Sequence, residues 1–186
     1  MYDAIVLAGG AARRLGGVAK PQLRVGDATL LDRVLAAVPD AGVVVVAGPS
    51  QPVSRSVVWC REEPPGGGPV AALAAALPHV TAATVLVLAA DLPEVAPAVA
   101  PLLAAVPDGG AAVLTDPDGR ANHLAAAWSR PALAEALARL GPPAGASMRA
   151  LVAQVDIASV ADRGGWGRDC DTWDDVDEAR ARRRDG

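Results

Sequence analysis

Short, uninterrupted apolar runs constrain the fold of this 186-residue chain more than any other feature of its sequence. The runs are four or five residues long, consist mainly of Val, Ala and Leu, and show no alternation with polar residues. Runs of this kind are typical of strands that are buried on both faces. We therefore expect strands at residues 4–7, 43–47, 57–60, 85–89, 111–114 and 124–128.

Stretches with helical spacing of apolar residues lie between and after these runs. We expect helices at residues 30–38, 69–77, 93–106, 131–140, 147–152 and 173–184. Three of them begin with proline, which is common at the first helical position, and either Asp27 or Thr29 can cap the first helix. The alternation of strand and helix predicts one α/β domain over residues 1–186, with a mostly parallel, Rossmann-like sheet and helices on both faces.

Composition excludes several classes of protein. The net charge of −4 argues against a nucleic-acid coat, and two cysteines are too few for a disulfide framework. No apolar run approaches the roughly 18 residues of a membrane helix. The chain starts with Met1, Tyr2 and Asp3 and has no basic segment before the first apolar run, so we expect no signal peptide. We therefore expect a cytoplasmic protein with neither a nucleic-acid nor a membrane partner.

Glycine, cations and carboxylates follow the ends of the predicted strands. In open α/β sheets the ligand site lies beyond the carboxyl ends of the strands, so these segments should meet at one edge. Such an edge suits a polyphosphate with a divalent metal. The segments are residues 9–20, 61–69, 91–93 and 116–120, and residues 168–172 precede the last predicted helix.

The loop after the first strand has the strongest chemical pattern. Residues 9–20 contain four glycines, two arginines and Lys20, the single lysine among 17 basic residues. Glycines let backbone amides approach a phosphate, and a lysine supplies a compact charge on a flexible stem. The glycine spacing fits neither a Walker loop nor a dinucleotide fingerprint. Two alternatives to phosphate binding stay open. The glycines serve only the geometry of a tight turn, and Lys20 is a surface residue without a specific role.

These residues resemble a known family. The sequence LAGG at residues 7–10, followed by RRLGG at 13–17 and Lys20, is similar to the signature loop of nucleotidyltransferases of the molybdenum cofactor guanylyltransferase type. Three further segments agree in order: GPVAA at 68–72, DLP at 91–93 and DCDT at 169–172. The resemblance covers essentially the whole chain, and it implies a fold like that of the nucleotide-diphospho-sugar transferases.

The resemblance implies a role for each matching position. The backbone of Leu7, Ala8, Gly9 and Gly10 would hold the base and ribose, and Gly68 would complete base recognition. Arg14 and Lys20 would hold the phosphates, and Asp91 would bind Mg²⁺. The catalytic residues would then be Arg14, Lys20 and Asp91. A plain helix cap is the alternative role for Asp91.

The implied reaction is the attack of a phosphorylated acceptor on the α-phosphorus of GTP, with pyrophosphate leaving. Positioning and charge neutralisation suffice for such a transfer, and the acceptor phosphate needs no general base. The implied acceptor is molybdopterin, which transient cofactor-delivery proteins could bring. Alternatives are a cytidylyltransferase or sugar-phosphate nucleotidyltransferase of the same fold, or a nucleotide-binding module without turnover.

The sequence also departs from the family pattern. Ala19 stands before the lysine where relatives have Asp, and Ala72 stands where they have Gly. Asp169 and Asp171 replace Asn, and Trp173 replaces Pro. Two roles for this acidic pair stay open: Asp169 and Asp171 supply additional metal ligands, with Asp171 the candidate, or they repel a phosphorylated pterin. The base preference, the acceptor and the oligomeric state stay open at this point.

Overall fold

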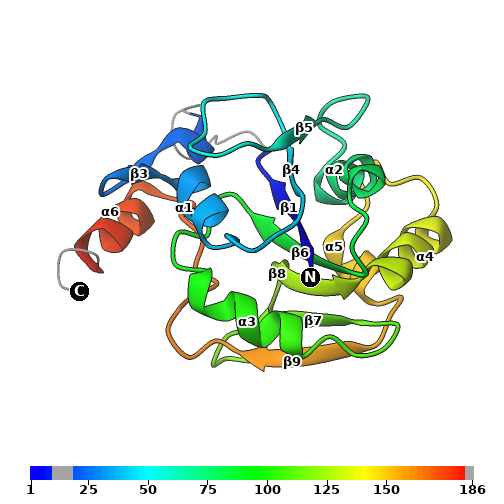
Figure 1. Ribbon diagram of the computed structural model, residues 1–186. Coiled ribbons are helices and arrows are strands. Elements are labelled where there is room, and N and C mark those ends of the chain that lie inside the picture. The colour runs from blue at the N-terminus through cyan, green and yellow to red at the C-terminus, as the bar shows by residue number, and fades with distance from the viewer. Residues whose placement is uncertain (10–18, 183–186) are drawn as a thin grey trace.

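A seven-stranded sheet forms the centre of the computed structural model, which describes residues 1–9 and 19–182 (Figure 1). The strand order is β5-β4-β1-β6-β8-β7-β9. Only β8 runs antiparallel to its neighbours in this sheet, so the prediction of a mostly parallel sheet is confirmed. The strands are β1 (Asp3–Leu7), β4 (Val44–Ala47), β5 (Val58–Cys60), β6 (Thr84–Ala89), β7 (Ala111–Thr115), β8 (Ala121–Ser129) and β9 (Ile157–Ala161).

Helices cover both faces of the sheet, as predicted. On one face α1 (Leu30–Ala36) and α3 (Ala96–Ala104) pack over side chains such as Val6 and Leu88. On the other face α2 (Pro69–Ala76), α4 (Arg130–Leu140) and α5 (Met148–Val152) pack over Ile5 and Val87. Neighbouring residues of one strand thus enter opposite cores, because successive strand side chains point to opposite faces. None of the helices described here is long and apolar enough to cross a membrane.

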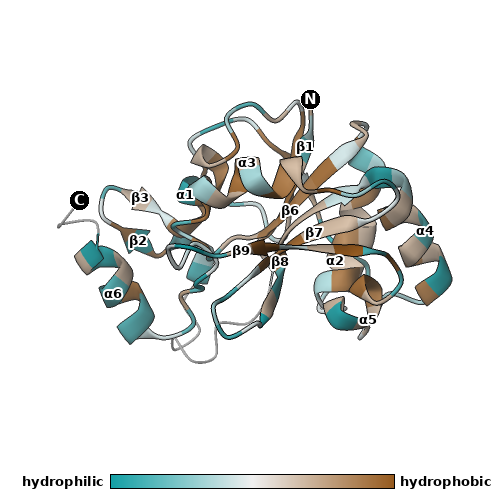
Figure 2. Cartoon of the chain, turned by 90° about the horizontal axis from the view of Figure 1, so that it is seen from below, coloured by the Kyte–Doolittle hydropathy of each residue, from teal (hydrophilic) through white to brown (hydrophobic). Residues whose placement is uncertain are grey.

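A third, smaller core lies beside the main sheet. It joins the hairpin β2 (Arg24–Val25) and β3 (Ala28–Thr29) to α6 (Trp173–Arg182), and Figure 2 shows these elements together at one end of the molecule. The Arg180 guanidinium also donates to the Arg24 carbonyl oxygen over 3.1 Å. The 3-10 turn η2 (Lys20–Gln22) leads into this hairpin, whereas η3 (Leu77–His79) follows α2. The core consists of Leu23, Val25, Leu30, Cys170, Val176 and Ala179.

Two predictions about local structure were wrong or incomplete. The helix expected from Pro93 begins at Ala96, because the chain first makes a turn in which the Val95 amide donates to the Leu92 carbonyl. The edge strand β9 was not predicted, because it pairs only with β7 and alternates between exposed and half-buried residues, so it lacks a continuous buried run. Of the two cap candidates for α1, Thr29 accepts the hydrogen bond from the Asp32 amide.

Asp3 ties the start of β1 to the segments before β4 and β6. Its side chain is 2% exposed and accepts hydrogen bonds from the amides of Val43 (2.8 Å), Thr81 (2.7 Å) and Ala82 (2.8 Å). Burial alone would raise the pKa of this carboxyl, but the backbone donors outweigh it and the pKa is lowered. Asp3 therefore carries its charge in the folded protein and fixes the three central strands at the edge opposite the candidate site.

We expect Asp3→Ala to lower the free energy of unfolding by about 3 kcal/mol, because it leaves buried amides without an acceptor. Urea denaturation at neutral pH measures the change, with Asp118→Ala in the exposed turn after β7 as the matched control. The contribution of Asp3 should be complete above the pKa of an unfolded Asp and disappear as pH falls through the lowered folded-state pKa. Equal unfolding free energies for the two variants would contradict this role.

Candidate active site

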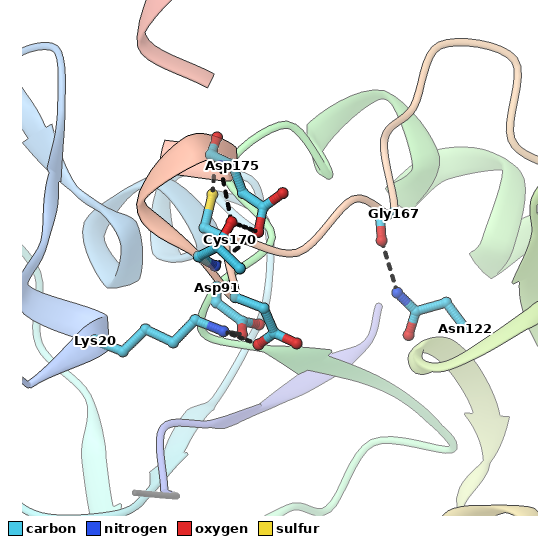
Figure 3. A network of polar contacts seen from close by, with 8 residues as sticks. Lys20, Asp91, Asn122, Gly167, Cys170 and Asp175 are labelled. Atoms are coloured by element: carbon cyan, nitrogen blue, oxygen red, sulfur yellow. Dashed lines mark hydrogen bonds and ion pairs between the residues drawn. The ribbon is translucent and has the colours of Figure 1, made fainter. Parts of the chain in front are cut away.

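Lys20 joins two carboxylates that are far apart in the sequence. Its ammonium donates to Asp91 Oδ2 and, over 2.6 Å, to Asp171 Oδ1 (Figure 3). Lys20 is the first residue of η2, Asp91 follows β6 through Ala90, and Asp171 lies in the loop before α6. Three segments named by the sequence analysis thus meet at one point, at the carboxyl edge of the sheet.

The charges of this cluster are partly shielded from water. The Lys20 side chain is 15% exposed and that of Asp91 is 20% exposed, whereas Asp171 is 47% exposed. Burial lowers the pKa of Lys20, but the hydrogen bonds to Asp171 and Asp91 outweigh it, so the pKa is raised and Lys20 stays an ammonium. Burial and the negative charges of Asp171 and Asp91 raise the pKa of Asp169. Within residues 1–9 and 19–182, one ammonium therefore faces three carboxylates, an arrangement that attracts cations.

The loop that carries Asp171 is held from both sides. The Cys170 amide donates to the Asp91 carbonyl oxygen over 3.2 Å, and Asn122 Nδ2 donates to the Gly167 carbonyl oxygen over 2.9 Å (Figure 3). Farther back, the Asp162 carboxylate accepts hydrogen bonds from the amides of Gly164, Trp166 and Gly167. This loop is therefore tied to the ends of both β6 and β8.

A capping box fixes the residue that follows Asp171. The Thr172 amide donates to Asp175 Oδ2 over 2.7 Å, and the Asp175 amide donates back to Thr172 Oγ1 over 3.2 Å. The hydrogen bond from the Thr172 hydroxyl is the largest of the effects that lower the pKa of Asp175. Since Cys170 belongs to the third core, Asp171 is held between a buried residue and a helix cap.

Backbone groups at the end of β1 that the resemblance assigns to the nucleotide are already used in hydrogen bonds within the protein. The Ala8 amide donates to the Ala47 carbonyl oxygen over 2.8 Å, and the Leu7 carbonyl accepts from the Ala90 amide over 3.0 Å. Leu7 and Ala8 are both buried, and Gly9 is exposed. Of these three residues, Gly9 is the one exposed to solvent. The predicted site residues Gly10 and Arg14 lie outside the described residues.

Gly48 is a residue of this edge that the sequence analysis did not single out. A Cβ atom at Gly48 would lie 2.8 Å from the Ala8 carbonyl group, so only glycine allows β4 to end so close to the first loop. Its signal in the sequence is a glycine directly after a buried strand, much as Gly9 follows β1.

Gly68 lies directly before α2 and has φ = +89°, a conformation that favours glycine. A Cβ atom at Gly68 would have open space around it, and the residue itself is half-buried. The family departure at Ala72 does not narrow this space, because Ala72 packs into the core under α2. Gly68 takes no part in the hydrogen bonds described for the Lys20 cluster.

The donor set at Lys20 fits a magnesium ion that also binds phosphate. The described residues contain no group of three or more His, Cys, Asp or Glu side chains arranged as a metal site. Asp91 and Asp171 nevertheless converge on a single cation, the Lys20 ammonium. Mg²⁺ is usually bound by one or two carboxylates, with substrate phosphates and water completing its shell. Two convergent carboxylates therefore suffice for a metal that arrives with a nucleotide.

A family model decides the classification. The model, described as a MobA-like NTP transferase domain, matches residues 4–159. The chain belongs to the MobA-like NTP transferase family. The matched part of this family member includes Lys20 and Asp91 but ends before Asp169 and Asp171.

Curated relatives agree with this assignment. The chain is 34% identical over 167 residues to a molybdenum cofactor guanylyltransferase from Acidiphilium cryptum, covering 85% of this chain and 82% of that protein. It is 40% identical over 111 residues to a probable molybdenum cofactor guanylyltransferase from Synechococcus elongatus, covering 55% of this chain. That second match spans only 56% of the Synechococcus protein.

Solved structures share the fold. A nucleotidyl transferase from Methanothermobacter thermautotroptrophicus superimposes with a TM-score of 0.81 at 18% identity, covering 100% of this chain and 99% of the other. The 2-C-methyl-D-erythritol 4-phosphate cytidylyltransferase from Thermus thermophilus gives a TM-score of 0.74 at 24% identity, covering 97% and 98%. At these sequence identities, the structural similarity shows a shared fold and does not extend to function.

We expect Cys170 to be inert toward thiol reagents in the folded protein. Its side chain is 2% exposed, and burial together with Asp91 raises its pKa to about 12, so at pH 8 only about one thiol in ten thousand is ionised. Reaction with a disulfide reagent on the Cys60→Ser variant measures Cys170 alone, and denaturant should release the thiol. Rapid reaction of the folded variant would show that the loop does not dock on Asp91.

Proposed function

We propose that this protein is a Mg²⁺-dependent nucleotidyltransferase that transfers GMP from GTP to a molybdopterin-type cofactor and releases pyrophosphate. The observation that carries the proposal is the meeting of Lys20, Asp91 and Asp171 beside the end of β1. The names of the curated relatives support the guanylyl group and the acceptor. The partners are thus small molecules, with cofactor-delivery proteins as transient ones.

Each side chain of the cluster has a part in such a transfer. Lys20 binds the phosphates and neutralises the charge that builds up on the departing pyrophosphate. Asp91 and Asp171 hold the metal, and Mg²⁺ when bound supplies charge neutralisation at the phosphate oxygens. An oxygen of the acceptor phosphate forms a bond to the α-phosphorus, and the bond from that phosphorus to pyrophosphate breaks. The attacking oxygen is already anionic, so no base has to remove a proton.

A half-open hollow near the cluster is the position that we propose for the acceptor. It measures about 210 Å³ and lies between the turn after Asp91 and the start of α6, with Pro93, Asp169 and Asp175 in its wall. Arg168 and Glu178, which also line it, form an ion pair over 3.1 Å. The wall also carries Asp169, where relatives carry Asn, so an acceptor bound here lies beside carboxylates as well as Arg168.

One specific observation favours a second candidate. The fold is shared with a cytidylyltransferase over nearly the whole chain, and the residues of the Lys20 cluster would contact phosphates and metal but not the base. The same cluster could therefore serve CTP with the same acceptor. Gly9, Gly48 and Gly68, which shape the edge next to β1 and β4, are the described positions at which a choice of base would be made.

Pyrophosphate release from GTP, CTP, ATP and UTP, each with molybdopterin and with or without Mg²⁺, tests the proposal. We expect release with GTP that depends on Mg²⁺ and that falls about 10²–10³-fold in Lys20→Ala, because one preorganised cation is lost. Arg139→Ala is the matched control, since Arg139 is an exposed cation on α4.

The other outcomes are equally informative. Pyrophosphate release with CTP alone would leave the proposed chemistry unchanged and show that the nucleotide base is cytosine instead of guanine. Nucleotide-dependent thermal stabilisation without any pyrophosphate release would identify a binding module and overturn the proposal of an enzyme. Equal rates for wild type and Lys20→Ala would exclude the role of Lys20.

A further inference from the structure

The Lys20 ammonium lies where a metal ion bound by Asp91 and Asp171 would lie. It contacts Asp91 Oδ2 and Asp171 Oδ1 at the same time, and these two carboxylates come from segments that are far apart in the sequence. A divalent metal bound to these same two oxygens would meet the ammonium, a like charge, at contact distance. Metal and lysine therefore exclude each other at this point.

The Lys20 ammonium also cannot simply withdraw. Its side chain is only 15% exposed, and leaving a shielded charge without an anion is costly. To release Asp91 and Asp171 it needs another anion within reach of its flexible stem. A nucleotide polyphosphate at the adjacent end of β1 is such an anion, because β1 and β6 are neighbours and Asp91 lies just beyond the end of β6.

We infer that Lys20 occupies the metal site of the nucleotide-free protein, so that divalent metal binds tightly only once polyphosphate has taken the ammonium away from Asp91 and Asp171. The inference rests on the proposed function, because it takes Asp91 as a metal ligand. Lys20 thus has two anionic partners in succession, first the carboxylates and then the nucleotide. By linkage the metal raises nucleotide affinity by the same factor as the nucleotide raises metal affinity.

Mn²⁺ binding to the nucleotide-free protein tests this directly, with free Mn²⁺ measured by electron paramagnetic resonance. We expect weak binding to wild type and binding about tenfold or more tighter to Lys20→Met, a change in the range typical of coupled sites. Arg139→Met is the matched control, since it removes an exposed cation elsewhere and should bind Mn²⁺ like wild type. The double variant Lys20→Met with Asp91→Asn should lose the tight binding.

Thermal unfolding checks the fold of every variant, and Lys20→Gln replaces Lys20→Met if the latter does not fold. Equal Mn²⁺ affinity of wild type and the Lys20 variant, with both dependent on Asp91, would overturn the inference and leave the proposed metal site intact. Mn²⁺ binding that does not change in Asp91→Asn, with or without GTP, would overturn both the inference and the proposed metal site. Mn²⁺ binding that is weak in wild type, tight in the Lys20 variant and lost in the double variant supports both the inference and the proposed metal site.

Discussion

The ion pairs of one ammonium with two carboxylates organise the candidate active site of this protein. Asp91 and Asp171 lie 71 and 151 positions after Lys20, and no local structure could bring the three residues together. The third core brings Lys20 and Asp171 together, because Leu23 follows Lys20 closely, Cys170 precedes Asp171, and both are buried in it. The Cys170 amide then joins this loop to the Asp91 carbonyl oxygen. A small apolar cluster at the end of the molecule thus sets the geometry of a polar site.

The central sheet and the loop before α6 hold Asp91 and Asp171 in position. Asp91 is placed by β6, a central strand whose neighbour β1 ends at the first loop, and Asp3 fixes both strands at the opposite edge. The loop from Asp162 to Asp171 is held by backbone hydrogen bonds to a carboxylate, to Asn122 and to the end of β6. Under the proposed function, Asp91 and Asp171 are thus in place before the ligands bind, and the flexible Lys20 side chain is the group that has to move.

The sequence was sufficient for those parts of the fold that depend on local pattern. Buried strands such as β1 and β6 were predicted within a residue because continuous apolar runs are unambiguous, but the direction of β8 and the edge strand β9 depend on tertiary pairing. At the site, Lys20, Asp91 and Asp171 were each named in advance. Their mutual contact was not, because it depends on packing between α6 and the β2–β3 hairpin, and neither Gly48 nor Asp162 carries a motif.

A crystal structure with GTP and Mn²⁺, in which anomalous scattering locates the metal, tests the central claim most directly. The account predicts Mn²⁺ at coordination distance from Asp91 and Asp171, with the Lys20 ammonium moved onto the phosphates of the nucleotide. If Lys20 still joins Asp91 and Asp171 in that complex while the metal lies elsewhere, the ion pairs are structural and the account of this edge as a nucleotidyltransferase site is contradicted.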